Sequence, residues 1–539
     1  MGEDARALAE LLEELKRRSG YSYERIGVKT HLSRSTVHRY CRGSSLPAAF
    51  GPLERIATVC GADRGELSKL YRLWERADVA RDNAATSAPF APEPVPAPEP
   101  VSPPLPEPGP GPAPVPVARG RKRRWSLLAA TLALVTLVGA SSLPTVTAEP
   151  PPARRILAPM WTLRPQPVAR ELLGVTVSSA TGMMPAFGVG SVRLWDSRTR
   201  WQNIEPARER FDWSTLDGLV EGARKAGFPV LFVFGGTPRW ASPSAPPTAY
   251  PDGSRAAPPD DLADWDRFVG KVVERYRGRI EAYELWDMAN HPKFFTGPVE
   301  RLVEMTRRAS RIIRAADPEA TVVCPSMGQL AEPASRRVLE RFGELGGYES
   351  CDAAAVKLHA RRAADPPETM LAMADELEQI FHRTGGHANL WSTGTDFETP
   401  YQPPVDPDTA ADHAARFYLT GLYARYQRMY FYSWGSARVP IVLQPAGGPP
   451  TKAAAYVERL GQWLAGARIT SCRKGAQAGL PENLWQCDFE RNGERFRICW
   501  THEGTARLPA SGPAERLDGT RVETGEITGT PALLRAASS

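Results

Sequence analysis

The sequence has little cysteine and no CxxC pair. It contains seven cysteines in 539 residues, and without closely spaced pairs a structural zinc site is not expected, so we predict no metal and no cofactor. Net charge is also small, because 67 Lys and Arg face 61 Asp and Glu, for a balance of +6. The chain as a whole is therefore neither strongly basic nor strongly acidic.

The distribution of charge and cysteine is uneven. Residues 1–82 have 15 Lys and Arg against 12 Asp and Glu, and the run Arg119–Arg124 adds five more cations. Positive charge is therefore concentrated in the first quarter of the chain, where it can bind nucleic acid or an anionic membrane surface. If the larger, later part is exported, Cys472 can pair with Cys487 or Cys499, but the five cysteines there cannot all pair with one another, and the connectivity stays open. These five are Cys324, Cys351, Cys472, Cys487 and Cys499.

Proline is abundant, with 52 residues, about twice the usual share. Much of it lies between Ala84 and Val117, in a stretch of Pro, Ala, Glu and Val that fixes φ repeatedly and offers nothing to bury. We predict a disordered, semi-rigid linker there. The chain is also longer than the length at which a single hydrophobic core stops growing, which indicates two to four domains.

After the cations of Arg119–Arg124 comes the uncharged stretch Ser126–Leu143, which ends at Pro144. Eighteen helical residues span roughly 27 Å, close to a hydrocarbon core of about 30 Å, so one transmembrane helix fits. The alternatives are a buried core helix, or a signal peptide cleaved after the small residues of Thr145–Ala148. Because the cations precede the segment, we expect the N-terminus in the cytoplasm and the remainder outside it.

The first 82 residues favour a small helical domain. Leucines 8, 11, 12 and 15 recur at helical spacing, Ser22 can begin a second helix that runs to Lys29, and Ser33 a third. Two short helices joined by a tight turn, the second rich in Arg, Ser, Thr and His, are typical of a helix-turn-helix. The alternative is a helical module that binds another protein and not DNA, because the net charge of residues 1–82 is only modestly positive.

The stretch SYERIGVKTHLSRSTVHRYCRGSSLP resembles the Xre or lambda-repressor-like group, in particular the N-terminal module of some actinobacterial regulators. The resemblance implies that DNA is a partner. It also implies major-groove contacts from Arg34, Ser35, Thr36 and Arg39, with Arg42 on a phosphate.

From residue 173 onward, short apolar runs alternate with amphipathic helical stretches. Eight such runs over about 290 residues fit a (β/α)8 barrel. After Ile469 short alternating strands indicate a small β domain. The candidate barrel strands are 173–177, 191–195, 230–234, 282–286, 321–324, 354–358, 389–392 and 429–433.

The segment VRLWDSRTRWQNIEPARERFDWSTLDGLVEGARKAGFPVLFVFGGTPRWAS resembles the second and third βα units of clan A glycoside hydrolases. It is most similar to family 39, which contains β-xylosidases and iduronidases. YELWDMANHPKFFTG stands where active members read Trp-Asn-Glu-Pro-Asn, and LWSTGTDF where they read Trp-x-Thr-Glu-x-Gly. The resemblance therefore puts Met288 at the general acid and Gly394 at the nucleophile.

Retaining glycosidases need two carboxyl groups about 5 Å apart, and neither a thioether nor a glycine supplies one. The resemblance thus implies a barrel that is inactive by the family mechanism. Asp287, Asp396 and Glu398 remain nearby, and hydrolysis by Asp287 and Asp396 is the alternative to a role in hydrogen bonding. We further expect Glu284 to point into the barrel and pair with Arg193.

Sugar-binding side chains are expected at the carboxyl ends of the barrel strands, where aromatic faces stack on pyranose rings. The motifs VRLWD, TPRWAS, WDMAN, KLHA, LWST and YSWG place six candidates there, of which Trp240 and Trp434 are favoured. The six are Trp195, Trp240, Asn290, His359, Trp391 and Trp434.

Together these features predict a single-pass membrane regulator that reads DNA inside the cell and binds a glycan outside it with an inactive barrel. Dimerisation is possible, and Gly139 gives it slight support. An active membrane-anchored glycosidase and a partner-binding protein without a ligand are the alternatives. The predicted limits are 1–82 for the helix-turn-helix, 83–118 for the linker, 119–144 for the membrane helix, 145–170 for a tether, 171–467 for the barrel and 468–539 for the β domain.

Overall fold

The computed structural model describes residues 3–30, 32–47, 51–63, parts of 66–77, 159–384, 389–396, 398–508, 513–522 and 525–535. Within these ranges, no helix combines the length and the apolar character needed to cross a membrane, which corrects the predicted single-pass topology and location. The segment Arg119–Pro144, on which that prediction depended, lies outside the described residues, as does the linker at 83–118.

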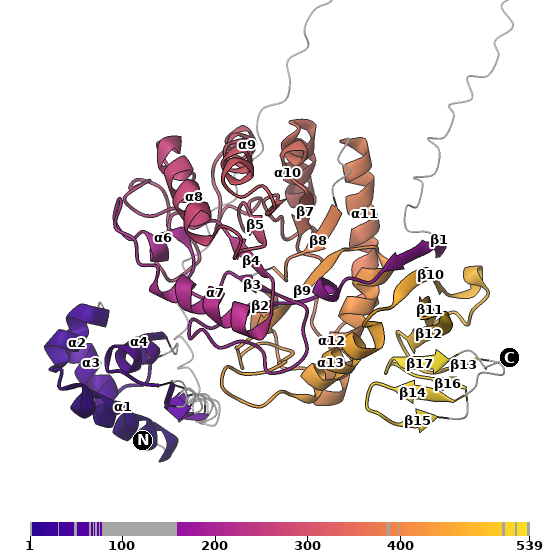
Figure 1. Cartoon of the computed structure of the whole chain (residues 1–539), viewed down its shortest axis with the longest axis horizontal. Coiled ribbons are helices and arrows are strands. Elements are labelled where there is room, and N and C mark those ends of the chain that lie inside the picture. Colours follow the sequence, from indigo (N-terminus) through magenta and orange to yellow (C-terminus); the bar gives the residue numbers. More distant parts are fainter. Residues whose placement is uncertain are drawn as a thin grey trace, which may run out of the picture. The chain divides into compact units, whose positions relative to one another are not determined.

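The amino-terminal domain consists of short helices around a core of its own, drawn in indigo in Figure 1. Leu8, Leu12 and Leu15 are buried, as their helical spacing predicts. The Ser33 hydroxyl accepts a hydrogen bond from the Thr36 backbone N–H (3.1 Å), so Ser33 is the predicted cap of the third helix. The helices are α1 (Glu3–Ser19), α2 (Tyr23–Thr30), α3 (Arg34–Cys41) and α4 (Gly51–Val59).

The turn between α2 and α3 depends on a glycine. A Cβ at Gly27 would lie 2.6 Å from the Leu32 carbonyl oxygen, which is shorter than any van der Waals contact. Gly27 therefore lets α2 and the turn approach closely enough to bring α3 across α2, the arrangement of a helix-turn-helix.

All eight predicted barrel strands are present, each within two residues of its predicted ends, and they close into a parallel barrel. The order around the barrel follows the sequence, as in a (β/α)8 fold. The strands are β2 (Leu173–Val177), β3 (Ser191–Leu194), β4 (Val230–Val233), β5 (Ala282–Glu284), β6 (Thr321–Val323), β7 (Ala353–Val356), β8 (Asn389–Ser392) and β9 (Arg428–Trp434).

Helices between the strands surround this barrel, and α8 to α11 stand side by side in Figure 1. Helix α8 shows why they form: the Asp261 carboxylate caps it at the Ala263 N–H (2.8 Å), and Trp265, Phe268 and Val272 bury one face at helical spacing. The helices are α6 (Trp201–Ile204), α7 (Ser214–Ala226), α8 (Leu262–Tyr276), α9 (Val299–Ala316), α10 (Pro333–Glu344), α11 (Met370–Arg383), α12 (Pro407–Tyr423) and α13 (Lys452–Leu464).

The barrel interior is filled by a few large side chains facing small ones. Trp391 and Tyr430 pack there with Ala282 and Ala353 in one buried cluster. A Cβ at Gly174 would lie 2.6 Å from the Tyr430 ring, so the glycine in β2 makes room for that ring. The interior is thus a packed core rather than a channel.

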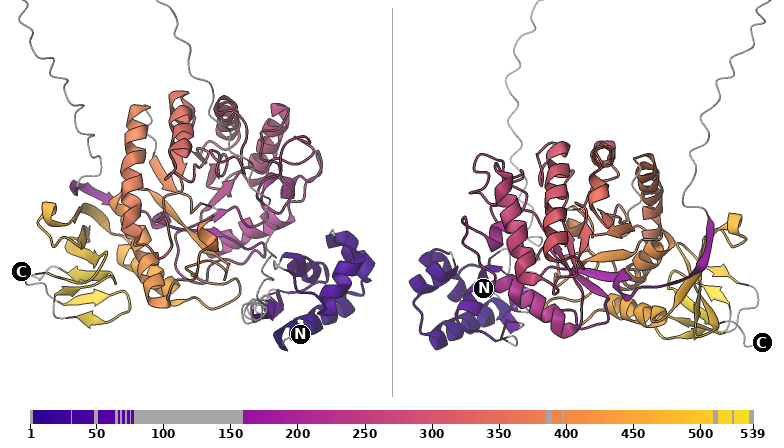
Figure 2. Two further views of the ribbon diagram at one scale, coloured as in Figure 1. Left: turned by 180° about the vertical axis from the view of Figure 1, so that it is seen from behind. Right: turned by 45° about the horizontal axis from the view of Figure 1, so that its top comes forward.

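The carboxyl-terminal β domain is a seven-stranded sheet with a separate two-stranded ribbon. Its strands near the C-terminus are yellow in Figures 1 and 2, whereas its edge strand β1 (Met160–Pro167) is purple. Strand β1 precedes the barrel in sequence, so part of the region assigned to a tether is a strand paired with β10. The other strands are β10 (Arg468–Lys474), β11 (Leu484–Arg491), β12 (Glu494–Thr501), β13 (Ala506–Arg507), β14 (Ala514–Arg516), β15 (Arg521–Val522), β16 (Glu526–Ile527) and β17 (Ala532–Arg535).

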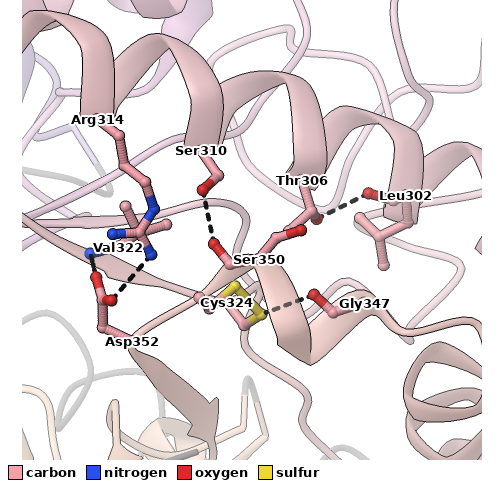
Figure 3. The surroundings of a disulfide bond; sticks show 10 residues. Leu302, Thr306, Ser310, Arg314, Val322, Cys324, Gly347, Ser350 and Asp352 are labelled. Carbon is pink, nitrogen blue, oxygen red and sulfur yellow. Dashed lines mark hydrogen bonds and ion pairs between the residues drawn. A yellow bond between two sulfur atoms is a disulfide. The ribbon is translucent and has the colours of Figure 1, made fainter.

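Two disulfides join cysteines in the described part of the chain. Cys472 pairs with Cys487 rather than with Cys499, and it does so across neighbouring strands β10 and β11, while Cys499 is buried and free. Cys324 at the end of β6 pairs with Cys351 (Figure 3), which joins β6 to the segment that leads into β7. Helix α9 holds the same segment, because Ser310 Oγ donates to the Ser350 carbonyl (2.6 Å).

Candidate functional site

A buried ion network lies below the mouth of the barrel, by which we mean the end where the carboxyl ends of its strands meet. Arg193 of β3 donates to both carboxylate oxygens of Glu284 in β5 (2.7 and 2.9 Å), as predicted, and also to Asp287 Oδ1 (2.6 Å). Lys357, the residue after β7, donates to the same Asp287 oxygen (2.5 Å) and to the Thr393 carbonyl (2.8 Å). All four charged side chains are at most 5% exposed. Two cations and two anions therefore neutralise one another inside the barrel.

The network holds Asp287 as a carboxylate. Burial alone would raise its pKa, but Lys357 and Arg193 outweigh that effect and hold the pKa of Asp287 well below its usual range. A general acid must instead keep its proton near neutral pH. Asp287 is therefore unsuited to protonate a leaving group, although it lies next to the acid position.

The two residues that the sequence resemblance equates with catalytic glutamates, Met288 and Gly394, have no ionisable side chain. Met288 is 2% exposed, and its sulfur packs so tightly against Gly328 that a Cβ on that glycine would lie 2.2 Å from it. Gly394 has a φ of +106°, a backbone conformation that L-residues rarely adopt. A Cβ at position 394 would find space, since its nearest neighbours would be at 3.7 Å or more, but the backbone of any residue with a side chain would be strained there.

Aromatic and charged side chains cover Asp287 from the mouth. Tyr250, from the loop after β4, donates to Asp287 Oδ2 (3.0 Å) and accepts from Trp195 Nε1 (3.0 Å). The Arg200 guanidinium stacks 3.7 Å from the centre of the Tyr250 ring and pairs with Asp196 and Asp252. Trp195 is 3% exposed, so it supports this layer instead of offering a free face.

A second polar group lies at the ends of β7 and β8. His359 Nε2 is 3.1 Å from Asp396 Oδ2, and Thr399 Oγ1 donates to the other oxygen of that carboxylate (3.1 Å). The pKa of Asp396 is lowered, since these partners outweigh its burial. Glu398, two residues further on, is exposed. His359 and Asp396, both singled out from the sequence, are thus brought together, whereas Asp287 belongs to the separate ion network.

The other predicted sugar-binding residues have structural contacts. Trp434 is 1% exposed and donates to Gln444 Oε1 (2.8 Å), and Trp240 packs edge-on against Trp201. Asn290 joins loops, because it donates to the Gly328 carbonyl and accepts from the Gly328 N–H.

Trp391 does not lie at the mouth, contrary to the expectation from its motif. Its Nε1 donates to Gln427 Oε1 (3.3 Å), and the Arg428 guanidinium lies 4.3 Å from its ring centre. Both partners lie where β9 begins, at the amino end of the barrel. The ring points into the closed interior because alternate side chains of a barrel strand face inward.

Three residues of the mouth were missed from the sequence. Lys357 and Tyr250 give no local signal, since their partners are 70 and 37 residues away. Tyr401 is 85% exposed in the loop after β8, and an aromatic residue shortly after a predicted barrel strand was the sequence signal that could have marked it. Among the residues that the structure describes, no group of three His, Cys, Asp or Glu side chains is placed to hold a metal ion.

The outer face of α3 carries the residues predicted to meet DNA. Arg34, Ser35 and Arg39 are exposed, whereas Val37 and Cys41 on the opposite face are buried. Thr36 is half-buried beside its Ser33 cap, and Arg42, just after the helix, is exposed. The helix therefore presents a basic and hydroxyl-rich face, as a recognition helix does.

Fold and site define a helix-turn-helix domain joined to a glycosidase-like barrel with a β domain. A family model described as a helix-turn-helix domain matches residues 7–70. The chain is similar to a family 39 glycoside hydrolase from the gut symbiont Bacteroides cellulosilyticus WH2, with 16% identity and a TM-score of 0.52 over 69% of this chain and 81% of that one. It is also similar to a monomeric β-xylosidase from Caulobacter crescentus CB15, with 12% identity and a TM-score of 0.50 over 69% and 97%. At these identities the likeness shows the fold alone, and no curated protein matched the chain.

Proposed function

We propose that this protein is a DNA-binding regulator whose barrel binds a carbohydrate without hydrolysing it. The amino-terminal domain supports the first part, through its fold, its family match and the exposed face of α3. The second part is supported by a glycosidase-like fold with Met288 and Gly394 at the two positions that the sequence resemblance equates with catalytic glutamates.

The observation that carries this proposal is the state of the barrel's carboxylates. Met288 and Gly394 occupy the proposed acid and nucleophile positions. The adjacent Asp287 is paired with both Arg193 and Lys357. Losing an acid catalyst alone costs about 10²- to 10⁴-fold in rate, and losing the nucleophile removes the covalent route as well. Binding is the simplest remaining use of the mouth.

Several polar groups remain at the mouth to bind a sugar. Asp196 accepts a hydrogen bond from Tyr432 Oη (2.8 Å), and Asp396 lies with His359 on the ends of β7 and β8. Carboxylates are good acceptors for sugar hydroxyls, and Tyr401, in the loop after β8, exposes an aromatic ring with an apolar face. A few polar groups and one aromatic platform are the usual elements of such a site.

Hydrolysis and binding are tested on the full chain. We expect no turnover of aryl glycosides, and calorimetric heat with at least one member of a panel of soluble oligosaccharides. The matched variant is Asp396→Asn, which removes a charge from the mouth and should weaken binding. Turnover that disappears in Asp396→Asn would identify a glycosidase that uses a displaced carboxylate, and would end the non-hydrolytic proposal.

DNA binding is tested by selecting sequences from a random pool and measuring mobility shifts at fixed salt. Arg39→Ala, on the exposed face of α3, should weaken the selected site by about 5- to 100-fold, the usual worth of one base contact. The control is Arg17→Ala, which removes the same charge from α1, where Arg17 pairs with Glu14. Equal losses in both variants, or no selected sequence at all, would contradict specific recognition by α3.

A further inference from the structure

A small cavity opens beside the mouth, between the segments that follow β7, β8 and β9. Its volume is about 60 Å³. Ala363 comes from the loop after β7, Thr395 from the loop after β8, and His413 and Phe417 from α12, while Phe431 and Ile441 complete the wall. Tyr432 also lines the cavity while its hydroxyl bonds Asp196, so the cavity and the polar mouth share a wall.

The walls are largely apolar, and the polar side chains of His359, Asp365 and Thr399 on them are each hydrogen-bonded to another residue. Two further polar atoms, on Thr395 and His413, differ from these. The Thr395 hydroxyl is buried and, among the described residues, has no hydrogen-bond partner. Buried polar groups are nearly always paired, so a buried hydroxyl on a cavity wall indicates a partner that binds there.

His413 supplies the second polar atom. It is 6% exposed, and its Nδ1 lies 3.2 Å from the Ala363 carbonyl oxygen, so Nδ1 carries the proton that this acceptor needs. Burial and the nearby Arg416 lower the pKa of His413, which keeps the ring neutral. Its Nε2 is then an acceptor, and in the described part of the chain no hydrogen bond reaches it.

The volume of the cavity and the polar atoms on its walls together limit which chemical group can bind there. A water needs about 10–15 Å³ of such space, so the cavity takes about four to six non-hydrogen atoms and cannot take a pyranose ring. An occupant should carry a small apolar end for Phe417, Phe431 and Ile441, an acceptor for the Thr395 hydroxyl and a donor for His413 Nε2. An acetamido group has all three: a methyl, a carbonyl oxygen and an N–H, in four non-hydrogen atoms.

We propose that this cavity binds the N-acetyl group of an amino sugar whose ring lies at the mouth. This inference rests on the proposed carbohydrate binding and names its ligand class. The methyl packs against the rings of Phe417 and Phe431, which contact each other edge-on, the carbonyl accepts from Thr395, and the amide N–H donates to His413.

Calorimetry of the full chain tests the proposal with two trisaccharides of equal length and linkage. One is β-1,4-linked N-acetylglucosamine, and the other is cellotriose, which has a hydroxyl where the first has an acetamido group. The acetylated ligand should bind at least tenfold more tightly, a difference of about 1.4 kcal/mol. Xylotriose serves as a third, smaller sugar.

Three variants separate the cavity from the mouth. Thr395→Val should reduce the preference for the acetylated ligand severalfold, and Thr395→Ser, which keeps a hydroxyl, should retain it. Ala363→Leu fills the cavity and should abolish the preference while leaving any cellotriose binding unchanged. Ala331→Leu, at an exposed alanine outside the cavity, is the size-matched control, and thermal unfolding checks that each variant is folded.

The outcomes distinguish this inference from the proposed function. Binding of sugars without an acetyl preference, or a preference that survives Ala363→Leu, overturns the acetyl site and leaves the carbohydrate-binding barrel intact. No heat with any of the three sugars overturns the acetyl site, and no heat with any member of the wider oligosaccharide panel overturns the proposed carbohydrate binding as well. An acetyl preference lost in Thr395→Val and Ala363→Leu, but kept in Thr395→Ser and Ala331→Leu, supports both.

Discussion

Replacing Lys357 by methionine should destabilise the barrel strongly, because it leaves an uncompensated negative charge in the interior. Asp287 would keep only one cation, shared through Arg193 with Glu284, in a network that is at most 5% exposed. Breaking a buried ion pair by removing one partner costs about 3–5 kcal/mol. At roughly 2 °C per kcal/mol for a large domain, the melting temperature should fall by about 6–10 °C.

Differential scanning calorimetry of the full chain at pH 7 measures this change. Lys452→Met is the control, because Lys452 pairs with Asp408 at the surface, where such a pair contributes about 0–1 kcal/mol. In the double variant Lys357→Met with Asp287→Asn, the charges again balance, so a substantial part of the loss should be recovered. A Lys357→Met shift as small as that of the control, or no recovery in the double variant, would refute the assignment of Lys357 as the counterion of Asp287.

Further predictions concern pH, the helix-turn-helix and a disulfide. Because the pKa of folded Asp287 lies below its unfolded value of about 3.9, its charge stabilises the fold above that value and the benefit is lost as pH falls. The difference in melting temperature between wild type and Asp287→Asn should therefore shrink from pH 6 to pH 3; a constant difference would contradict it. Gly27→Val should unfold the amino-terminal domain and abolish DNA binding, since its Cβ would collide with the Leu32 carbonyl, whereas the exposed Val28→Ala should change neither, as circular dichroism and mobility shifts will show. Replacing both Cys324 and Cys351 by alanine opens a 27-residue loop and should cost about 3.5 kcal/mol in denaturant unfolding, and an unchanged midpoint would show that the bond contributes nothing.

Local patterns in the sequence determined the elements of this protein. Helical spacing of leucines and the Ser33 cap predicted the helices of the first domain, and eight apolar runs predicted the barrel strands, because periodicity and capping act over a few residues. The pairing of Glu284 with Arg193 also followed from strand alternation. The same local reading made the segment Met160–Pro167 part of a tether, since an edge strand whose partner lies 300 residues away has no local signature.

The contacts and exposure of the candidate site residues could be predicted from the sequence only in part. The motifs led to the prediction that Met288 and Gly394 stand at catalytic positions, but they did not indicate which contacts the remaining polar and aromatic side chains make. Trp391 and Trp434 occupy strand positions that look equivalent in sequence to ligand-binding ones, yet one faces the barrel interior and the other is buried against Gln444. Exposure depends on which residues pack around a side chain, and those residues come from other βα units.

The sequence by itself determined a helix-turn-helix domain and an eight-stranded barrel. Only the tertiary structure decided that Lys357 neutralises Asp287, that Tyr250 covers it, and that loops after three different strands enclose a small cavity around Thr395. The physical reason is that charge pairing and enclosure depend on distances across the closed barrel, which join residues dozens of positions apart and leave no periodic trace along the chain.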